Sequence, residues 1–394
     1  MPGTRLTGRG SIRMFQSLHS QSEAISQGGN SAMKRILFGV ASLILIGLAV
    51  MALPAFTQAG APTVDISADY RWSTDEPIQW QDTTKYKKAG PYKFGFSNCS
   101  TTNAYAVYFW ETAKWEATKH PNKIAEFLTT DAGDSAAKQL SDVEDLIAKG
   151  IHALIIRPCT LDAAVPAIEK AMDKGIPVII SNRSTKTSKY VTQNTTPWFD
   201  RGRNQAEWVV KQLGGKGNIV SFEGPAGSGP AVEGFQGAMS VLKNNPNIKI
   251  LARKATNWSR AEAKATMEDW LQAFPKKIDG ILQQSGIMGA GVVEAIEEAK
   301  INPCSMPQSG DDYNGYMKWI LKNKCNMITT NPTWASGASV VAALMILDGQ
   351  PVPKQWNIPT KIYDATNIAE ITDLSKSDEW MPNILPKDWK IGGK

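Results

Sequence analysis

The sequence predicts an α/β protein of two doubly wound lobes, each a parallel sheet covered by helices on both faces, joined by a hinge. Short apolar runs without alternation, such as residues 153–156 and 177–180, are typical of strands buried on both faces. Between these runs, apolar residues recur at helical spacing from Leu161 to Met172. A second set of the same units begins near residue 197, and late strands lead back to the first set, which predicts two lobes.

The chain has 394 residues, enough for two domains, and its 42% of hydrophobic residues is ordinary for a globular protein. The formal net charge is +6, but residues 1–59 hold five basic residues and one acidic residue, so the remainder is nearly neutral. A nearly neutral body argues against nucleic acid as a partner. With three His, and no C-x-x-C among the four Cys, the sequence indicates neither a catalytic triad nor a zinc cage, and we expect no cofactor.

An export signal is expected at residues 33–59. A basic start at Met33 is followed by 18 apolar residues and a small-residue site, and cleavage near Ala59 would release the exported mature chain. An uncleaved membrane anchor is the alternative, because 18 apolar residues approach the length that spans a bilayer. Residues 1–32 are expected to be unstructured or to precede a mis-called translation start.

The first lobe is expected at residues 91–196 plus 331–354, after a polar surface extension at 60–90. Gly150 and Gly175 are expected to be left-handed residues just past helix ends. The strands and helices of this lobe are expected at 92–98, 103–119, 124–130, 136–147, 153–156, 161–172, 177–180, 190–192 and 336–347.

The second lobe is expected at residues 197–330 plus 355–365, followed by a polar tail at 366–394 that packs along the surface. Ser259 and Glu262 predict a capping box at the start of one of its helices. Its other elements are expected at 203–213, 218–222, 248–254, 278–283, 313–323 and 325–330, with two helices that end at Pro275 and Lys300.

Polar residues end several of the predicted strands. Arg157 follows one strand, and Asn182 and Arg183 follow the next. Open parallel sheets bind ligands at the carboxyl ends of their strands, so these side chains are candidate ligand contacts. The alternative is an arginine that snorkels at a sheet edge. A G-x-x-G-x-G run at 224–229 reverses the order of the dinucleotide-binding G-x-G-x-x-G and suits a tight turn from strand to helix.

Three motifs give the chain a resemblance to a known family: ISNR at 180–183, EGPAGSG followed by EGF within 223–235, and the late GDD at 310–312. Residues 91–365 resemble the type I periplasmic sugar-binding proteins, the ribose-binding-like group of ABC importer receptors. The resemblance implies that two lobes close on a sugar. By position it assigns ligand contacts to Asn103, Tyr105, Arg157, Asn182, Arg183, Trp258, Ser285, Asp311, and Thr330 or Asn331, of which we choose Asn331.

This sequence departs from the family pattern at three positions. The resemblance places Arg157 where the family usually has Asn, and Asn182 with Arg183 where it has an Asp–Arg pair. Gly229 stands where the family usually places an Arg shortly before the EGF motif. The resemblance therefore implies a cleft of the same kind with a different ligand, so that we expect a sugar but not ribose itself.

The chemistry of these residue types fits a hydroxylated ligand. Arg and Asn side chains can each bridge vicinal hydroxyls, and Asp311 can accept two further hydrogen bonds. Trp258 and Tyr105 can cover the apolar C–H faces of a sugar. Two of these residues have plain structural alternatives, core packing for Trp258 and a cap on the following helix for Asp311.

Export favours disulfide bonds among the four Cys. Within the fold that the resemblance implies, Cys99 and Cys159 follow the tips of neighbouring strands, whereas Cys304 and Cys325 begin successive strands. We expect the pairs Cys304–Cys325 and Cys99–Cys159.

The expected function is that of a monomeric periplasmic solute receptor, which captures a sugar or polyol and delivers it unaltered to an ABC permease. A periplasmic sensor subunit, which reports ligand occupancy to a membrane kinase or chemoreceptor, is the alternative and would have the same site. A sugar hydrolase would need two opposed carboxylates, and Asp311 alone is placed at a strand tip. A repressor of the lactose-repressor type is disfavoured, because an export signal stands in place of a DNA-binding head.

Overall fold

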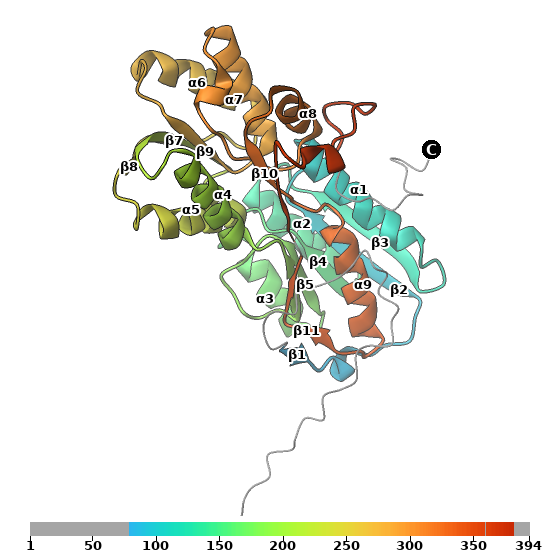
Figure 1. Ribbon diagram of the computed structural model, residues 1–394. Coiled ribbons are helices and arrows are strands. Elements are labelled where there is room, and N and C mark those ends of the chain that lie inside the picture. Colours follow the sequence, from blue (N-terminus) through green and yellow to red (C-terminus); the bar gives the residue numbers. More distant parts are fainter. Residues whose placement is uncertain (1–78, 359, 382–394) are drawn as a thin grey trace, which may run out of the picture. The chain divides into compact units, whose positions relative to one another are not determined.

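Two parallel sheets organise residues 79–358 and 360–381, which the computed structural model describes (Figure 1). The strands of the first sheet are β2 (Tyr92–Asn98), β3 (Ile124–Asp131), β4 (Ala153–Ile156), β5 (Val178–Asn182), β6 (Thr192–Thr195) and β12 (Gln355–Asn357). They are parallel in the order β12-β6-β5-β4-β2-β3. Its helices are α1 (Ala104–Thr118), α2 (Ala136–Ala148), α3 (Val165–Asp173) and α9 (Ala335–Leu347). We call this sheet with its helices the first lobe.

Alternate side chains of the central strands pack against helices on opposite faces of this sheet. Ile155 and Ile179 belong to the apolar cluster that contains residues of α1 and α9. Leu154 and Ile180 belong to the cluster that contains residues of α2 and α3. Because both faces are covered, the strands are continuous apolar runs in the sequence rather than alternating ones.

Local sequence signals mark the ends of these helices. Asn103 caps α1, since its side chain accepts a hydrogen bond from the backbone N–H of Ala106 at 3.0 Å. Ser135 caps α2 in the same way. Gly150 and Gly175 follow α2 and α3 with φ values of 72° and 74°, the left-handed conformation expected from the sequence.

A second sheet forms the core of what we call the second lobe. Its strands β7 (Gly217–Glu223), β8 (Ile248–Ala255) and β9 (Gly280–Gln283) are parallel in the order β8-β7-β9. Single parallel bridges join Ile281 to Gln308 and Asp311 to Thr329. The second of these bridges ends at β10 (Met327–Thr329), which pairs antiparallel with β13 (Ile362–Asp364). The helices are α4 (Trp198–Gln212), α5 (Gly229–Leu242), α6 (Arg260–Ala273), α7 (Gly286–Glu298) and α8 (Asn314–Asn323).

The second sheet is also covered on both faces. Val220 and Ile281 belong to a cluster with residues of α6 and α7. Ile219 and Leu282 belong to a cluster with residues of α4 and α5. Both lobes are therefore doubly wound, as the sequence predicts.

The last crossing between the lobes comes later than the sequence predicts. The sequence places residue 355 at the start of a second-lobe segment, but β12 pairs in parallel with β6 in the first sheet. This boundary is wrong because Trp356 is fully buried in the first-lobe cluster and holds the strand there. The chain crosses to the second lobe between Asn357 and Ile362, where β13 joins β10.

The fifth strand of the first sheet is also shifted from its expected place at 190–192. Strand β6 runs from Thr192 to Thr195 and is buried along its whole length although its residues are polar. Thr192 Oγ1 donates to the carbonyl of Pro353 at 2.6 Å, and Asn194 Nδ2 donates to Ser339 Oγ at 3.1 Å. These distant partners make a buried polar strand possible. Helix α4 then begins at Trp198, five residues before its expected start.

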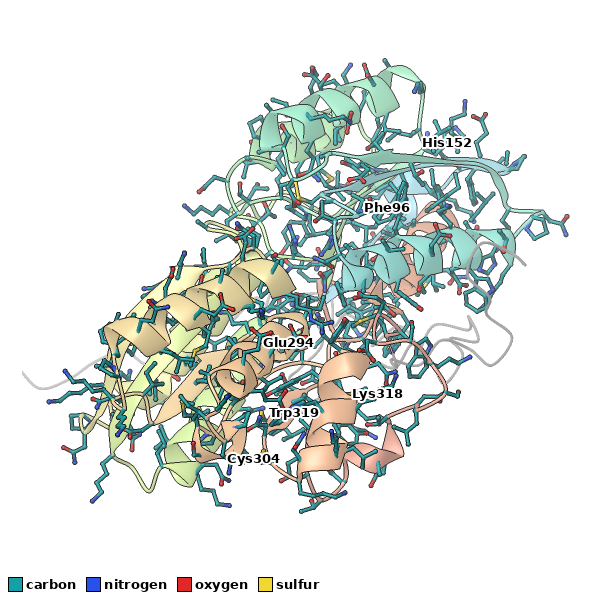
Figure 2. The ribbon with its side chains drawn as sticks, turned by 90° about the horizontal axis from the view of Figure 1, so that it is seen from above. Phe96, His152, Glu294, Cys304, Lys318 and Trp319 are labelled. Atoms are coloured by element: carbon teal, nitrogen blue, oxygen red, sulfur yellow. A yellow bond between two sulfur atoms is a disulfide. The ribbon has the colours of Figure 1, made fainter. Side chains whose placement is uncertain are left out.

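Both disulfide bonds expected from the sequence are present. Cys99–Cys159 joins the loops that follow β2 and β4 in the first lobe. Cys304–Cys325 lies in the second lobe, where Figure 2 labels Cys304 with Trp319 of α8, while Phe96 lies within the first lobe. The first bond ties together two loops at the carboxyl edge of the first sheet, next to the strand end that carries Arg157.

The described parts of the expected extension and tail are attached to the folded chain. Strand β1 (Trp80–Gln81) pairs antiparallel with β11 (Val352–Pro353). At the other end, Asn314 Nδ2 of α8 donates to the carbonyls of Asp373 at 3.0 Å and Ser377 at 2.8 Å. The expected export signal at 33–59 lies outside the described residues. None of the helices in the described ranges has the length and apolar character of a membrane span.

Candidate functional site

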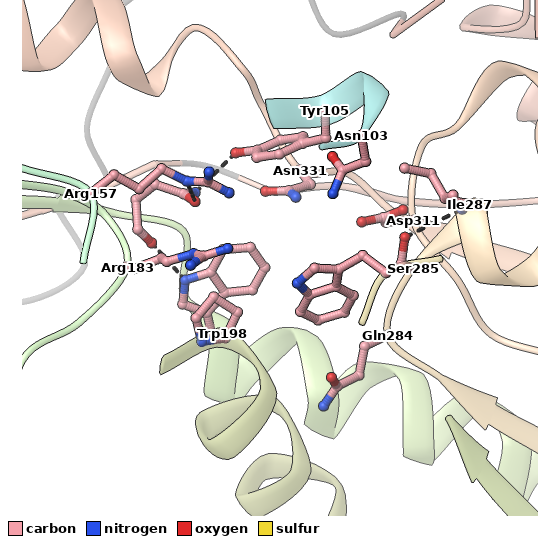
Figure 3. Close-up of a pocket in the computed structure, with 13 residues that line it drawn as sticks. Asn103, Tyr105, Arg157, Arg183, Trp198, Gln284, Ser285, Ile287, Asp311 and Asn331 are labelled. Atoms are coloured by element: carbon pink, nitrogen blue, oxygen red, sulfur yellow. Dashed lines mark hydrogen bonds between the residues drawn. The ribbon is translucent and has the colours of Figure 1, made fainter. Parts of the chain in front are cut away.

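One cavity brings together all nine side chains that the sequence assigns to ligand binding (Figure 3). It holds about 390 Å³ of space, its opening to solvent included, and residues from both lobes line it. Ligand pockets are often found at such interfaces between domains. The residues lining the cavity are Asn103, Tyr105, Arg157, Asn182, Arg183, Trp198, Pro230, Trp258, Gln284, Ser285, Ile287, Asp311 and Asn331.

Tyr105, Arg157 and Asn182 form a buried hydrogen-bonded group on the first-lobe side. Asn182 Nδ2 donates to Tyr105 Oη at 3.0 Å, and Arg157 Nε donates to Asn182 Oδ1 at 3.3 Å. Asn182 ends β5 with φ at 64°, a left-handed conformation that Asn tolerates better than most residues. Burial raises the pKa of Tyr105, so its hydroxyl keeps a proton that it can donate to a ligand.

Arg157 and Arg183 are buried in the first-lobe side of the cavity, with 4% and 3% of their surfaces exposed. Arg157 Nη1 donates to Asn98 Oδ1 at 3.3 Å, and Arg183 Nη1 donates to the carbonyls of Pro158 at 3.2 Å and Cys159 at 3.4 Å. Burial lowers the pKa of both arginines, and the pKa of Arg183 falls further because the charge of Arg157 is close. The sequence alternative of an arginine snorkelling at a sheet edge is therefore wrong for both.

Trp258 reaches the cavity from the loop before α6, over the backbone of Gly224. A Cβ atom at Gly224 would lie 1.8 Å from the Trp258 ring, so glycine is required for the indole to take this position. Trp258 itself has φ at 59°, a strained conformation for an aromatic residue. The loop thus presents a flat apolar surface to the cavity, although Trp258 also packs against the second-lobe core.

Asp311 lies on the side of the cavity opposite Arg157 and Arg183 (Figure 3). Its Oδ1 accepts from the backbone N–H of Gly286 at 2.5 Å, and its Oδ2 accepts from Arg201 Nη2 at 3.4 Å. The sequence alternative, a cap on the following helix α8, is corrected by this contact, because Asp311 bonds the first residue of α7. Burial raises the pKa of Asp311, while the charge of Arg201 opposes that shift.

Two further expected contacts lie beside Asp311. Ser285 caps α7, since its Oγ accepts from the backbone N–H of Ile287 at 3.3 Å. Asn331 lies at a crossing between the lobes, and its backbone N–H donates to Asp312 Oδ1 at 2.9 Å. Burial and the neighbouring Asp311 raise the pKa of Asp312 to about 8.

Four residues that line the cavity are not predicted from the sequence: Trp198, Pro230, Gln284 and Ile287. Trp198 Nε1 donates to the carbonyl of Asn182 at 2.7 Å, so this indole ties the start of α4 to the end of β5. Gln284 joins the start of α5 to the loop after β7, with Nε2 donating to Ala231 O at 3.0 Å and Oε1 accepting from Gly224 N at 3.1 Å. The sequence could have indicated Gln284, because it follows the same predicted strand as Ser285. Nothing in the sequence marks Pro230 or Ile287 as ligand contacts.

The site offers hydrogen bonds and apolar surface rather than paired acids or a metal cage. Among the described residues that line the cavity, Asp311 alone carries a carboxylate. A glycosidase uses two carboxyl groups about 5–9.5 Å apart across the scissile bond. No group of three or more His, Cys, Asp or Glu that could hold a metal occurs in the described part of the chain.

A family model described as a periplasmic binding protein domain matches residues 94–351. The chain is 33% identical to a xylitol-binding protein of Mycolicibacterium smegmatis over 174 residues, which are 44% of this chain and 50% of that protein. It is 26% identical to a ribose import binding protein of Bacillus subtilis over 289 residues, which are 73% of this chain and 92% of that protein.

A similarity to a solved structure supports the same architecture. The fructose-binding periplasmic domain of a hybrid two-component system is 28% identical to this chain, with a TM-score of 0.66. The match covers 71% of this chain and 92% of that domain. The matched fold is the one derived above from strand order and helix packing.

Proposed function

The chain belongs to the periplasmic binding protein family, and from this premise we propose that it captures a sugar or polyol between its lobes and delivers it to an ABC importer. The observation that carries the proposal is the meeting of nine polar and aromatic side chains, from segments far apart in the sequence, at one cavity. The relatives named for ribose and xylitol point to the same ligand class. In this proposal the protein acts in the periplasm as a monomer and docks on an inner-membrane permease.

The two sides of the cavity suit a hydroxylated ligand in different ways. Tyr105, Arg157 and Arg183 present donors from the first lobe, and Asp311 presents acceptor oxygens from the second. Sugar hydroxyls both donate and accept, so a single ring or open chain can satisfy both sides. Trp258 supplies an apolar face for C–H groups. Donor, acceptor and flat surface together make the cavity selective for polyhydroxy compounds.

Binding in this proposal closes the two lobes around a hinge. In the part of the chain that the structure describes, three segments cross between the lobes, and hydrogen bonds connect them. Thr196 Oγ1 donates to Asn331 Oδ1 at 3.4 Å across two of the segments. Thr330 N donates to the carbonyl of Lys361 at 2.8 Å across the second and third. Asn331 thus belongs both to the hinge and to the cavity, which couples closure to the ligand.

The family is one of binding proteins, and we propose that the ligand leaves chemically unaltered. Incubation of the purified protein with any ligand it binds, followed by mass spectrometry of the released compound, tests this point. Recovery of the starting compound supports release without chemical change, and steady formation of a product would contradict it.

A thermal-shift screen with pentoses, hexoses and their alditols tests the ligand class. A ligand that binds only the native state at one hundred times its Kd stabilises the protein by about 2.7 kcal/mol, which raises the melting temperature. We expect at least one polyhydroxy compound to do so, and amino acids and peptides to leave the melting temperature unchanged. Stabilisation by peptides or amino acids with no response to sugars would refute the proposed ligand class.

A sensor role is the second candidate, favoured by the similarity to the fructose-binding domain of a hybrid two-component system. The cavity would be the same, and only the surface that meets the partner would differ. Crosslinking of the exported protein in its native membrane, with and without ligand, separates the two functions. Capture of permease subunits supports import, whereas capture of a histidine kinase or chemoreceptor supports sensing.

A further inference from the structure

The arginines among the described residues fall into two groups. Four have a carboxylate within 4.0 Å, and two do not. The paired ones are Arg201 with Asp311, Arg203 with Asp200, Arg253 with Glu223 and Arg260 with Glu294. Arg157 and Arg183 are the unpaired ones, and they are the two that line the cavity. They are also almost fully buried, whereas three of the four paired arginines are partly exposed.

A buried charge without an opposite charge is costly, and proteins usually pair it. The acidic residues whose charges act on Arg157 are Asp131 and Asp134, but neither carboxylate lies within 4.0 Å of its guanidinium nitrogens. Thr101 donates to Asp131, and Thr102 Oγ1 donates to Asp134 Oδ2 at 3.1 Å. Asn182, whose side chain bonds both Arg157 and Tyr105, is a neutral amide and adds no compensating charge.

The hydrogen bonds of the two arginines leave specific donors unused. Protein oxygens occupy Nη1 of both side chains, and Asn182 occupies Nε of Arg157. Within the described residues, Nε of Arg183 is buried without a partner, and neither Nη2 atom makes a hydrogen bond. Arg253 shows what this edge can do, since its Nε and Nη2 donate to the two oxygens of Glu223 at 2.8 and 2.7 Å.

We propose that the ligand is a sugar or polyol that bears an oxyanion, a carboxylate or a phosphate ester, held between Arg157 and Arg183. Its hydroxyl groups point toward Asp311, because that carboxylate lies across the cavity and would repel the charged end (Figure 3). This inference rests on the proposed function and names the ligand class of the same site. A planar guanidinium matches such groups with two parallel hydrogen bonds, and hydrogen bonds to charged groups are worth about 1.5–3 kcal/mol each.

The test is isothermal titration of the wild-type protein with matched series of neutral and acidic compounds. Each series holds a five- or six-carbon aldose or alditol together with its aldonate, its uronate and its phosphate ester. We expect an acidic member to bind at least about tenfold more tightly than its neutral parent, which corresponds to about 1.4 kcal/mol. Tighter binding of the uronate or aldonate would identify the oxyanion as a carboxylate, and tighter binding of the ester would identify it as a phosphate.

Substitutions then test whether Arg157 and Arg183 cause the preference for the acidic compound. Arg183→Met and Arg157→Met should each bring the affinity ratio of acid to neutral compound close to one. Arg183→Lys, which keeps the charge but loses the fork, should retain part of the preference. Arg203→Gln, at an exposed arginine outside the cavity that pairs with Asp200 at 3.1 Å, should leave the ratio as in the wild type.

The outcomes separate this inference from the function on which it rests. Neutral sugars that bind as tightly as their acids, or more tightly, overturn the oxyanion and leave the proposed function standing. Failure of every neutral and acidic member to bind overturns both. If the methionine variants do not fold, the comparison of acidic and neutral ligands on the wild-type protein still tests the inference, because it needs no substitution.

Discussion

The two sides of the cavity hold arginine in opposite ways. On the second-lobe side, Arg201 pairs with Asp311 and also donates from Nε to Thr329 Oγ1 at 3.1 Å, so the protein compensates its charge. On the first-lobe side, Arg157 and Arg183 donate only to neutral oxygens of amide and carbonyl groups. The comparison teaches that burial alone does not define the role of an arginine. The available partner does, and on the first-lobe side the proposed partner is the oxyanion of the ligand.

The largest effect is expected where an internal pair is broken. Arg201→Met leaves Asp311 buried without its partner, and breaking a buried pair in this way costs about 3–5 kcal/mol. Urea denaturation at neutral pH should show this loss in the free energy of unfolding. Adding Asp311→Asn to Arg201→Met should recover much of the loss, because no unpaired charge remains. A single variant as stable as the wild type would show that the pair does not compensate Arg201.

The matching substitution on the other side should behave in the reverse way. Arg183→Met removes a buried charge that has no protein partner, so the free energy of unfolding should stay constant or rise. Affinity for the ligand should fall by about 2 kcal/mol or more, as for truncation of a buried charged hydrogen-bond partner. Denaturation without ligand and titration with ligand measure the two effects. A destabilisation as large as that of Arg201→Met would erase the distinction between the two sides.

A pH effect is expected from the second-lobe side. The pKa of Asp312 is raised to about 8 by burial and by Asp311, so the folded state keeps a proton that the unfolded state has lost. Stability should therefore fall as pH rises from the ordinary aspartate range toward 8, by at most about 1.4 kcal/mol per pH unit for one proton. Asp312→Asn should flatten this slope in denaturation curves recorded across that range. Asp162→Asn is the control, because Asp162 is exposed and should leave the slope unchanged.

The smallest expected effect concerns shape rather than charge. In Gly224→Ala the new Cβ would lie 1.8 Å from the Trp258 ring, so the indole must move. We expect ligand affinity to fall about tenfold, or about 1.4 kcal/mol, with the fold retained. Titration calorimetry measures the change, and Gly90→Ala, where the nearest atoms lie at 3.7 Å, is the control. Equal affinity in both variants would remove Trp258 from the ligand surface.

Much of the fold follows from the sequence because both sheets are buried on both faces. Runs such as 153–156 and 177–180 are typical of central parallel strands, whose carboxyl ends meet at one edge of a sheet. That is why Arg157, Asn182 and Arg183 could be placed together in advance. In the second lobe, Ser285 and Asp311 also follow predicted strands, whereas Trp258 was assigned only through the resemblance.

Other features depend on partners that are distant in the chain. Strand β6 is polar, and it is buried only because Pro353 and Ser339 accept its hydrogen bonds. Strand β12 has no apolar run, and one buried indole, that of Trp356, keeps it in the first sheet. Trp198 lines the cavity because it bonds the carbonyl of Asn182. Local patterns do not contain such information, since each case is decided by tertiary contacts.

The three passages of the chain between the lobes have a mechanical consequence. Two domains joined by one connecting segment can rotate relative to each other in many directions, whereas three connecting segments restrict the rotation to nearly one axis. Opening then follows one path, and little orientational freedom is given up when the halves meet. In the proposed function, the energy of the contacts then goes mainly into holding the ligand, and we expect fast release to depend on a protein that binds both lobes and separates them.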